Sequence, residues 1–247
     1  MGEINRVDDA YQLNNYLPLL YKNNLEQDYI SFLWDSFQTN YEESKYQFAY
    51  LPFHMLIMCF VYFTIWKIRN IIPDDFFKAL VGFRRETETE LLNATSPFTF
   101  SVVSEKRIFR FLKLIDCQNS TIGKYLKLVD VRDNIAHSNG NIFFRSLDIF
   151  EEKIEEALRC VIEIQEHFNG ILMEYFKQFL RDNWNPDDRQ YLETDELMRE
   201  HFIRENYISE MDINQCAILD INEMQDEPNF DEVRELNDSF VSMFSAL

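Results

Sequence analysis

The segment from Tyr46 to Trp66 contains no charged side chain, and most of its residues are apolar. Such a segment is stable where it is buried, either in a protein core or in a bilayer. Its uninterrupted apolar piece, Met55 to Trp66, is shorter than the roughly 20 residues that a transmembrane helix needs. Pro52 is expected to begin the helix, because proline fits a first helical turn, and the basic flanks show no orientation bias. We therefore predict a core helix of a bundle. The alternative is a membrane-attached helical protein.

Glycine and proline are scarce, with 5 Gly and 6 Pro among 247 residues. Sandwiches, barrels and propellers need many tight turns, so these classes are disfavoured. The glycines are never close together, which excludes the glycine-rich phosphate loops of P-loop and dinucleotide-binding folds. The 23 Phe and 12 Tyr require burial and argue against a disordered chain.

Apolar residues recur at helical spacing along most of the chain. The pattern predicts helices over residues 27–44, 53–66, 73–92, 104–115, 121–137 and 147–180. A loop or short extended piece is expected over residues 93–104, and Pro186 prevents the last helix from continuing. We predict an all-α fold, with a helical bundle over residues 1–184 and an acidic helical extension over residues 185–247.

The four cysteines, Cys59, Cys117, Cys160 and Cys216, are more than 40 residues apart. This spacing suits neither a metal clip nor a disulfide framework, so we expect free thiols in a reducing compartment. The first residues include acids and no apolar run of the secretory type. The sequence therefore predicts a cytoplasmic protein.

The formal net charge of −19 argues against general binding of nucleic acid, because such a surface repels a polyanion. Residues 101–145 differ, with 8 basic and 4 acidic side chains, which leaves room for a restricted phosphate-binding patch or a merely solvated helix face. Residues 185–247 have 4 basic and 17 acidic side chains. Three interpretations of them stay open: a solvated extension, a partner-docking module, or a nucleic-acid mimic that shields the basic segment.

The segment from 129 to 140 combines three side chains that suit chemistry on a phosphodiester. Asp133 and His137 are four residues apart on a predicted helix, so the carboxylate can accept a hydrogen bond from the imidazole and orient it. Arg132 is a permanent cation suited to bidentate phosphate recognition. An arginine and a histidine on one short element are the minimum for cleaving RNA without a metal ion. The ribose 2′-OH supplies the nucleophile, histidine moves a proton, and arginine offsets charge on the transition state.

An ideal helix places residues five apart about 140° from each other. Arg132 and His137 therefore converge if the helix distorts or ends near His137, or if two copies of the motif face each other across a dimer axis. Asn139 and Gly140 favour the first of these, because they stop helices.

The series Arg132, Asp133, Asn134-Ile135-Ala136 and His137 resembles the signature of the HEPN superfamily. Those domains are all-α bundles in which an Arg-polar-x-x-x-His motif precedes the final long helix, here residues 147–180. The resemblance covers residues 25–184. The overall acidity departs from the common pattern and puts constitutive RNA binding in doubt.

The resemblance implies a metal-independent endoribonuclease without a cofactor, with Arg132, Asp133 and His137 as catalytic residues. It also implies a homodimer and a role in toxin–antitoxin or antiviral defence, with RNA as substrate and an antitoxin or regulatory protein as partner. Four polar or basic side chains within or near the motif are further candidates for RNA contact: Lys124, Lys127, Asn134 and Arg145.

The alternative function is a non-catalytic HEPN-like module for protein–protein interaction or regulation. In that case Arg132 would pair with Asp116 or another acid, and His137 would interact with the last carbonyls of its helix. The other histidines, His54, His167 and His201, have no spacing that suggests a metal site, so we expect core or surface roles for them.

Overall fold

A computed structural model describes residues 7–137 and 140–244 of the chain. All named elements within these ranges are helices, which confirms the predicted all-α fold. The chain forms two compact units: unit 1 consists of residues 1–14 and 23–167, and unit 2 of residues 15–22 and 168–247. The division falls inside α8 (Leu147–Asn183), a helix of 37 residues. The bundle over residues 1–184 and the extension over residues 185–247 stay a prediction.

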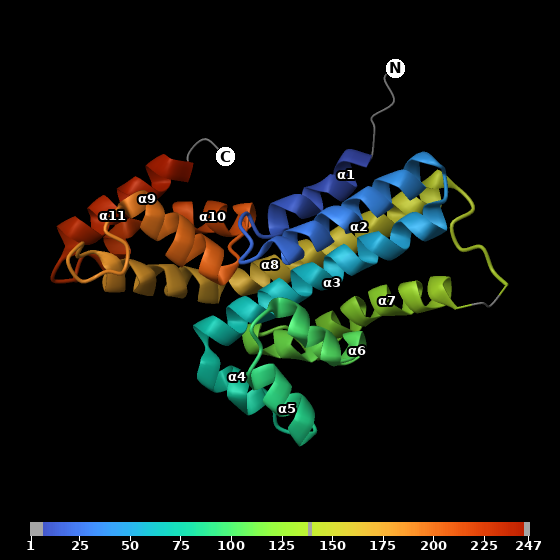
Figure 1. Cartoon of the computed structure of the whole chain (residues 1–247), viewed down its shortest axis with the longest axis horizontal. Coiled ribbons are helices and arrows are strands. Elements are labelled where there is room, and N and C mark those ends of the chain that lie inside the picture. Colours follow the sequence, from blue (N-terminus) through green and yellow to red (C-terminus); the bar gives the residue numbers. More distant parts are fainter. Residues whose placement is uncertain (1–6, 138–139, 245–247) are drawn as a thin grey trace, which may run out of the picture. The chain divides into compact units, whose positions relative to one another are not determined.

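Unit 1 contains most of the helices that precede α8, with short 3-10 helices (η) between longer α-helices (Figure 1). These elements are α1 (Val7–Tyr11), η1 (Gln12–Tyr16, which reaches into unit 2), α2 (Asn24–Glu42), α3 (Tyr46–Ile71), α4 (Pro73–Ala79), α5 (Arg85–Leu92), η2 (Pro97–Val102), α6 (Glu105–Ile108), η3 (Phe109–Ile115) and α7 (Asn119–Ala136).

Helices α2 and α3 form a hairpin at the centre of unit 1 (Figure 1). α2 begins at an Asn23 cap, whose side chain accepts a hydrogen bond from the backbone N–H of Glu26. Its apolar stripe buries Ile30, Leu33 and Phe37 against α3 and neighbouring elements.

By length and composition, α3 is the one described helix that could cross a membrane. However, 83% of its most apolar window is buried inside the protein. Burial of this extent is typical of the core helix of a soluble protein, and it agrees with the predicted core helix.

Three local predictions were wrong. Pro52 lies inside α3 rather than at its start. Without an N–H it weakens the first turns, but Ala49 and Tyr50 before it are fully buried, and their packing offsets this cost.

The other two errors concern the segments that follow α3. The predicted helix over 73–92 begins at Pro73 as expected but is divided into α4 and α5, because Gly82 adopts a φ of +89°, which a right-handed helix does not allow. The predicted loop over 93–104 contains η2, since the Ser96 side chain caps it and Pro97 suits its first position.

Unit 2 combines the C-terminal part of α8 with five shorter elements. They are α9 (Thr194–Glu196), the π-helix η4 (Leu197–Arg204), α10 (Glu210–Ala217), η5 (Ile221–Met224) and α11 (Phe230–Phe244). Phe202 of η4 lies at the centre of this unit, with ring centroids 5.2 Å from Phe176, 4.9 Å from Phe179 and 5.7 Å from Phe240.

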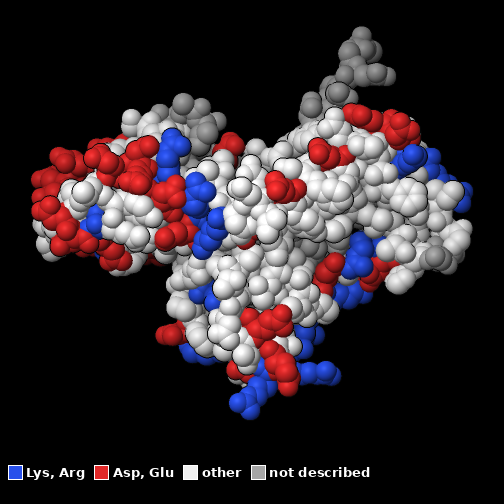
Figure 2. All heavy atoms as spheres, viewed as in Figure 1, with Lys and Arg blue, Asp and Glu red and all other residues white. Residues whose placement is uncertain are grey.

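Unit 2 also includes residues 15–22, because the backbone N–H of Leu19 donates to the carbonyl of Ile208 over 3.0 Å. Ser209 and Asp212 cap α10 reciprocally, each side chain accepting the other residue's backbone N–H. Acidic side chains cover much of unit 2 on the face drawn in Figure 2. The acidic C-terminal sequence thus packs, together with the end of α8, around an aromatic core.

Candidate functional site

Helix α7 carries the predicted motif and ends at Ala136. Leu128 and Ile135 are buried and fix the helix against the rest of unit 1. His137 is the C-cap residue, with φ −88° and ψ 141°, so the helix stops at this residue. The predicted stop at Asn139 lies outside the described residues, while Gly140 has a φ of +75°. The motif therefore spans the last turn of a helix and the first residue beyond it.

The His137 side chain is exposed to solvent at this helix end. Its backbone N–H donates to the carbonyl of Asp133 over 3.1 Å. Within residues 7–137 and 140–244, its ring makes no hydrogen bond or ion pair, including none to the Asp133 carboxylate. An exposed imidazole in this position is accessible to a substrate.

Arg132 lies between two carboxylates. Its Nη2 donates to Oε2 of Glu105 over 2.5 Å, and its Nη1 lies 3.0 Å from Oδ1 of Asp133. The side chain is 29% exposed, and its Nε is buried without a described partner. These contacts hold the guanidinium in one orientation, and they also neutralise it locally.

Glu105, the first residue of α6, connects three helices. Its Oε2 accepts the bond from Arg132 of α7 and lies 3.0 Å from Nε2 of His54 in α3. Burial raises the pKa of this carboxyl group, but the hydrogen bonds and charges of His54 and Arg132 outweigh burial, so the pKa falls below its ordinary value. In turn, Glu105 outweighs the effect of burial on Arg132 and raises the pKa of the guanidinium. The network therefore contains a stable carboxylate and a permanent cation.

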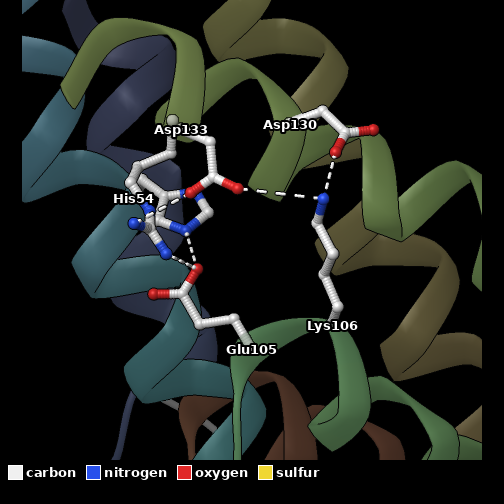
Figure 3. A network of polar contacts seen from close by, with 6 residues as sticks. His54, Glu105, Lys106, Asp130 and Asp133 are labelled. Atoms are coloured by element: carbon white, nitrogen blue, oxygen red, sulfur yellow. Dashed lines mark hydrogen bonds and ion pairs between the residues drawn. The ribbon is translucent and has the colours of Figure 1, made fainter. Parts of the chain in front are cut away.

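Asp133 contacts basic side chains in place of the histidine that the sequence suggested. In addition to Arg132, its carboxylate faces Lys106, whose Nζ lies 3.8 Å from Oδ2 of Asp133 and 2.6 Å from Oδ1 of Asp130 (Figure 3). Two permanent cations beside a carboxylate attract it more strongly than an exposed imidazole does. Asp133 thus positions Arg132 rather than His137 in this structure.

Sequence reasoning missed His54 and Glu105, which lie 51 residues apart in the chain. His54 is 1% exposed, and its Nδ1 is buried without a described partner. One signal was available: a histidine in an otherwise uncharged core helix needs a hydrogen-bonding partner, because buried polar groups are rarely left unpaired. Nothing in the sequence indicated that this partner would be Glu105.

The predicted RNA contacts fall into two groups. Lys124 and Lys127 line a groove of about 740 Å³ between α7 and α8, together with Lys153 and Arg159. Three glutamates share the groove, and one of them, Glu163, lies 3.2 Å from Nζ of Lys124. Asn134 and Arg145 are exposed on α7 and in the segment before α8, and they do not line this groove. The groove is mixed in charge, with four cations against three carboxylates.

Among the described residues, no group of three or more His, Cys, Asp or Glu side chains is arranged to hold a metal ion. None of the four cysteines forms a disulfide; Cys59, Cys117 and Cys216 are buried and Cys160 is half-buried. Burial raises the pKa of the Cys160 thiol to about 11, with the Glu163 charge contributing, so the thiol is protonated at neutral pH.

Comparisons of the chain with protein-family models, with curated proteins and with solved structures give no match.

The Glu105 network predicts a specific dependence of stability on pH. Since the folded-state pKa of Glu105 is below its unfolded value, its stabilisation is present above about pH 4.3 and is lost as the pH falls through the folded-state pKa. Glu105→Gln is expected to lower the free energy of unfolding at pH 7 by about 1–3 kcal/mol. The free energy of unfolding of this variant should also fall less steeply than that of the wild type as the pH becomes acidic. Urea unfolding at several pH values measures both quantities.

Glu155→Gln provides the control for this comparison, because Glu155 is exposed on α8 and makes no ion pair with the described residues. Its pH profile should match that of the wild type. A Glu105→Gln profile parallel to the wild type across the acidic range would contradict the role given to Glu105.

Proposed function

We propose that this protein is a metal-independent endoribonuclease that uses His137 and Arg132. The observation that carries the proposal is the end of α7 at Ala136, which leaves the His137 ring exposed just beyond the helix that holds Arg132. Histidine can take up and release a proton near neutral pH, and arginine binds phosphate oxygens bidentately. The resemblance of this motif to the HEPN signature supports the same reaction.

In the proposed reaction, the ribose 2′-OH attacks the adjacent phosphorus while His137 takes its proton. The bond from phosphorus to the 5′ oxygen breaks, that oxygen takes up a proton from water as it leaves, and His137 returns its proton to the solvent. Arg132 stabilises the negative charge that accumulates on the phosphoryl oxygens in the transition state. The products are a 2′,3′-cyclic phosphate and a free 5′-OH, with no change in oxidation state and no cofactor.

RNA binding requires Arg132 to exchange a carboxylate for a phosphate. Asp133 is the more exposed of its two partners, at 35% against 23% for Glu105, and Lys106 can hold it once it is released. Glu105, bonded to both His54 and Arg132, stays in place as the positioning residue. The exchange has an energetic cost, which suits an enzyme with low activity toward RNA in general.

The setting that the resemblance implies is part of the proposal. It comprises a cytoplasmic homodimer in a toxin–antitoxin or antiviral defence system, with RNA as substrate and an antitoxin or regulatory protein as partner. Lys124 and Lys127, with Lys153 and Arg159 beside them, are the candidate contacts for the RNA backbone in the groove between α7 and α8. Asn134 and Arg145 are candidates outside the groove.

Incubation of the purified protein with total RNA in EDTA tests the reaction directly. We expect cleavage to continue in the chelator, because neither proposed group needs a metal ion, and the fragments to carry 2′,3′-cyclic phosphate and 5′-OH ends. End-group analysis with a phosphate-specific kinase and ligase identifies them. Strict dependence on added metal, or products with 5′-phosphate ends, would rule out this mechanism.

A second candidate function is a non-catalytic module for protein–protein interaction. The observation that favours it is the double ion pair of Arg132, since a guanidinium between two carboxylates is also a common structural contact. Complete absence of RNA cleavage by the correctly folded protein, over a range of RNAs and with any required partner present, would favour this candidate.

A further inference from the structure

A mainly apolar pocket of unit 1 has Glu105 in its lining. It has a volume of about 590 Å³ and lies between α2, α3, η2 and the first residue of α6. This volume is within the range of cavities that bind small molecules, about 300–1,000 Å³. No residue of the Arg132–His137 motif lines it.

The inner wall of the pocket is apolar. Met58 and Cys59 of α3 are buried there, and the ring of Phe98 lies edge-on to Tyr29, with centroids 5.4 Å apart. Burial raises the pKa of the Cys59 thiol and, as the largest of several causes, that of the Tyr62 hydroxyl, so both are uncharged at neutral pH. The outer rim is apolar too, because Leu25 is 80% exposed and Met55 is 41% exposed.

The charged residues of the lining are all acidic. Glu26 and Glu105 line the pocket, and no lysine, arginine or histidine does. Glu26 is 4% exposed, and its carboxylate accepts a hydrogen bond from the Ser96 hydroxyl over 2.7 Å. An anionic ligand would therefore meet two carboxylates without a lining cation, which is unfavourable at short range.

Glu105 offers an acceptor to a ligand in the pocket. Its Oε2 interacts with both His54 and Arg132, whereas its Oε1 forms no hydrogen bond or ion pair with the described residues. In Figure 3 the two oxygens point in different directions, and the dashed lines end at one of them. A positively charged nitrogen would make a charge-assisted hydrogen bond with the other oxygen.

We propose that this pocket binds a small organic cation: an aromatic or otherwise apolar body that fills the space between Met58, Tyr29 and Phe98, with a protonated amine directed at Glu105. The proposal does not depend on ribonuclease activity. If both hold, the ligand and Arg132 share one carboxylate, so occupancy of the pocket weakens the hold of Glu105 on Arg132.

Three probes with the same phenylethyl body and different charge test the proposal: phenethylamine, phenethyl alcohol and hydrocinnamate. Titration of the full-length isotope-labelled protein, followed by NMR, gives each affinity. We expect the amine to bind about tenfold more tightly than the alcohol, as a charge-assisted hydrogen bond warrants, and the carboxylate more weakly than the alcohol. Equal affinities for amine and alcohol, or preferred binding of hydrocinnamate, would overturn the proposal.

Two tryptophan variants on the same 3-10 helix locate the binding. Ser101 is exposed and lines the pocket, so Ser101→Trp is expected to obstruct it and abolish phenethylamine binding. Val102 is also exposed, at 42%, but does not line the pocket, so Val102→Trp should bind as the wild type does. Unchanged binding by Ser101→Trp, or loss of binding in both variants, would overturn the assignment to this pocket.

Discussion

Replacement of His137 by alanine is expected to reduce RNA cleavage in EDTA by about 10²- to 10⁴-fold, the usual contribution of a positioned acid–base group. The imidazole is exposed and makes no hydrogen bond or ion pair with the described residues, so its removal is expected to leave the fold intact. The loss should therefore appear in the rate of the chemical step, with RNA affinity nearly unchanged. Single-turnover cleavage of a labelled RNA, with the protein in excess, measures this rate.

His167→Ala is the matched control, since His167 is a half-buried histidine of unit 1 outside the motif. It should retain cleavage at close to the wild-type rate, and both variants should unfold near the wild-type denaturant midpoint. Cleavage by His137→Ala at the wild-type rate would remove the imidazole from the mechanism, whatever the behaviour of Arg132.

Replacement of Phe37 by alanine is expected to lower the free energy of unfolding by about 3–5 kcal/mol, as is usual for removal of a buried aromatic ring. Phe37 is fully buried in α2, and its ring contacts aromatic rings from α1, α2, α3 and α8. The cavity left by the ring would lie where these helices meet, so they cannot easily close it. Guanidinium unfolding followed by circular dichroism measures the change.

Phe32 provides a control on the same helix, because its side chain is 61% exposed. Phe32→Ala should change the free energy of unfolding by no more than about 0.5 kcal/mol. If Phe37→Ala does not fold, Phe37→Leu, which keeps much of the volume, should be folded and destabilised by about 1 kcal/mol. Equal stability of the Phe37→Ala and Phe32→Ala proteins would contradict the central position given to Phe37.

The long helices could be predicted from the sequence because their apolar residues follow one period over many turns. The predicted range 147–180 lies within α8, which ends at Asn183, and the predicted range 121–137 differs from α7 by a few residues. Short elements were harder, because local propensity competes there with tertiary packing. Pro52 illustrates this: proline alone indicates a helix start, whereas burial of the residues before it extends α3 back to Tyr46.

The part of the candidate site that lies along one helix could be predicted from the sequence. The contacts between different helices could not. The spacing of Arg132 and His137 is a local property, and the structure places both on or next to α7. The partners of Arg132 depend on how α6 and α3 pack against α7, which spacing does not encode. For that reason Glu105 and His54 were overlooked, and the carboxylate of Asp133 was assigned to the wrong neighbour.

Glu105 begins α6, a helix of four residues that continues directly into η3. Loss of the Glu105 contacts would leave His54 without this hydrogen bond and Arg132 with Asp133 as its remaining described partner. The availability of the arginine to a phosphate therefore depends on two carboxylates, one within the motif and one at the start of another helix.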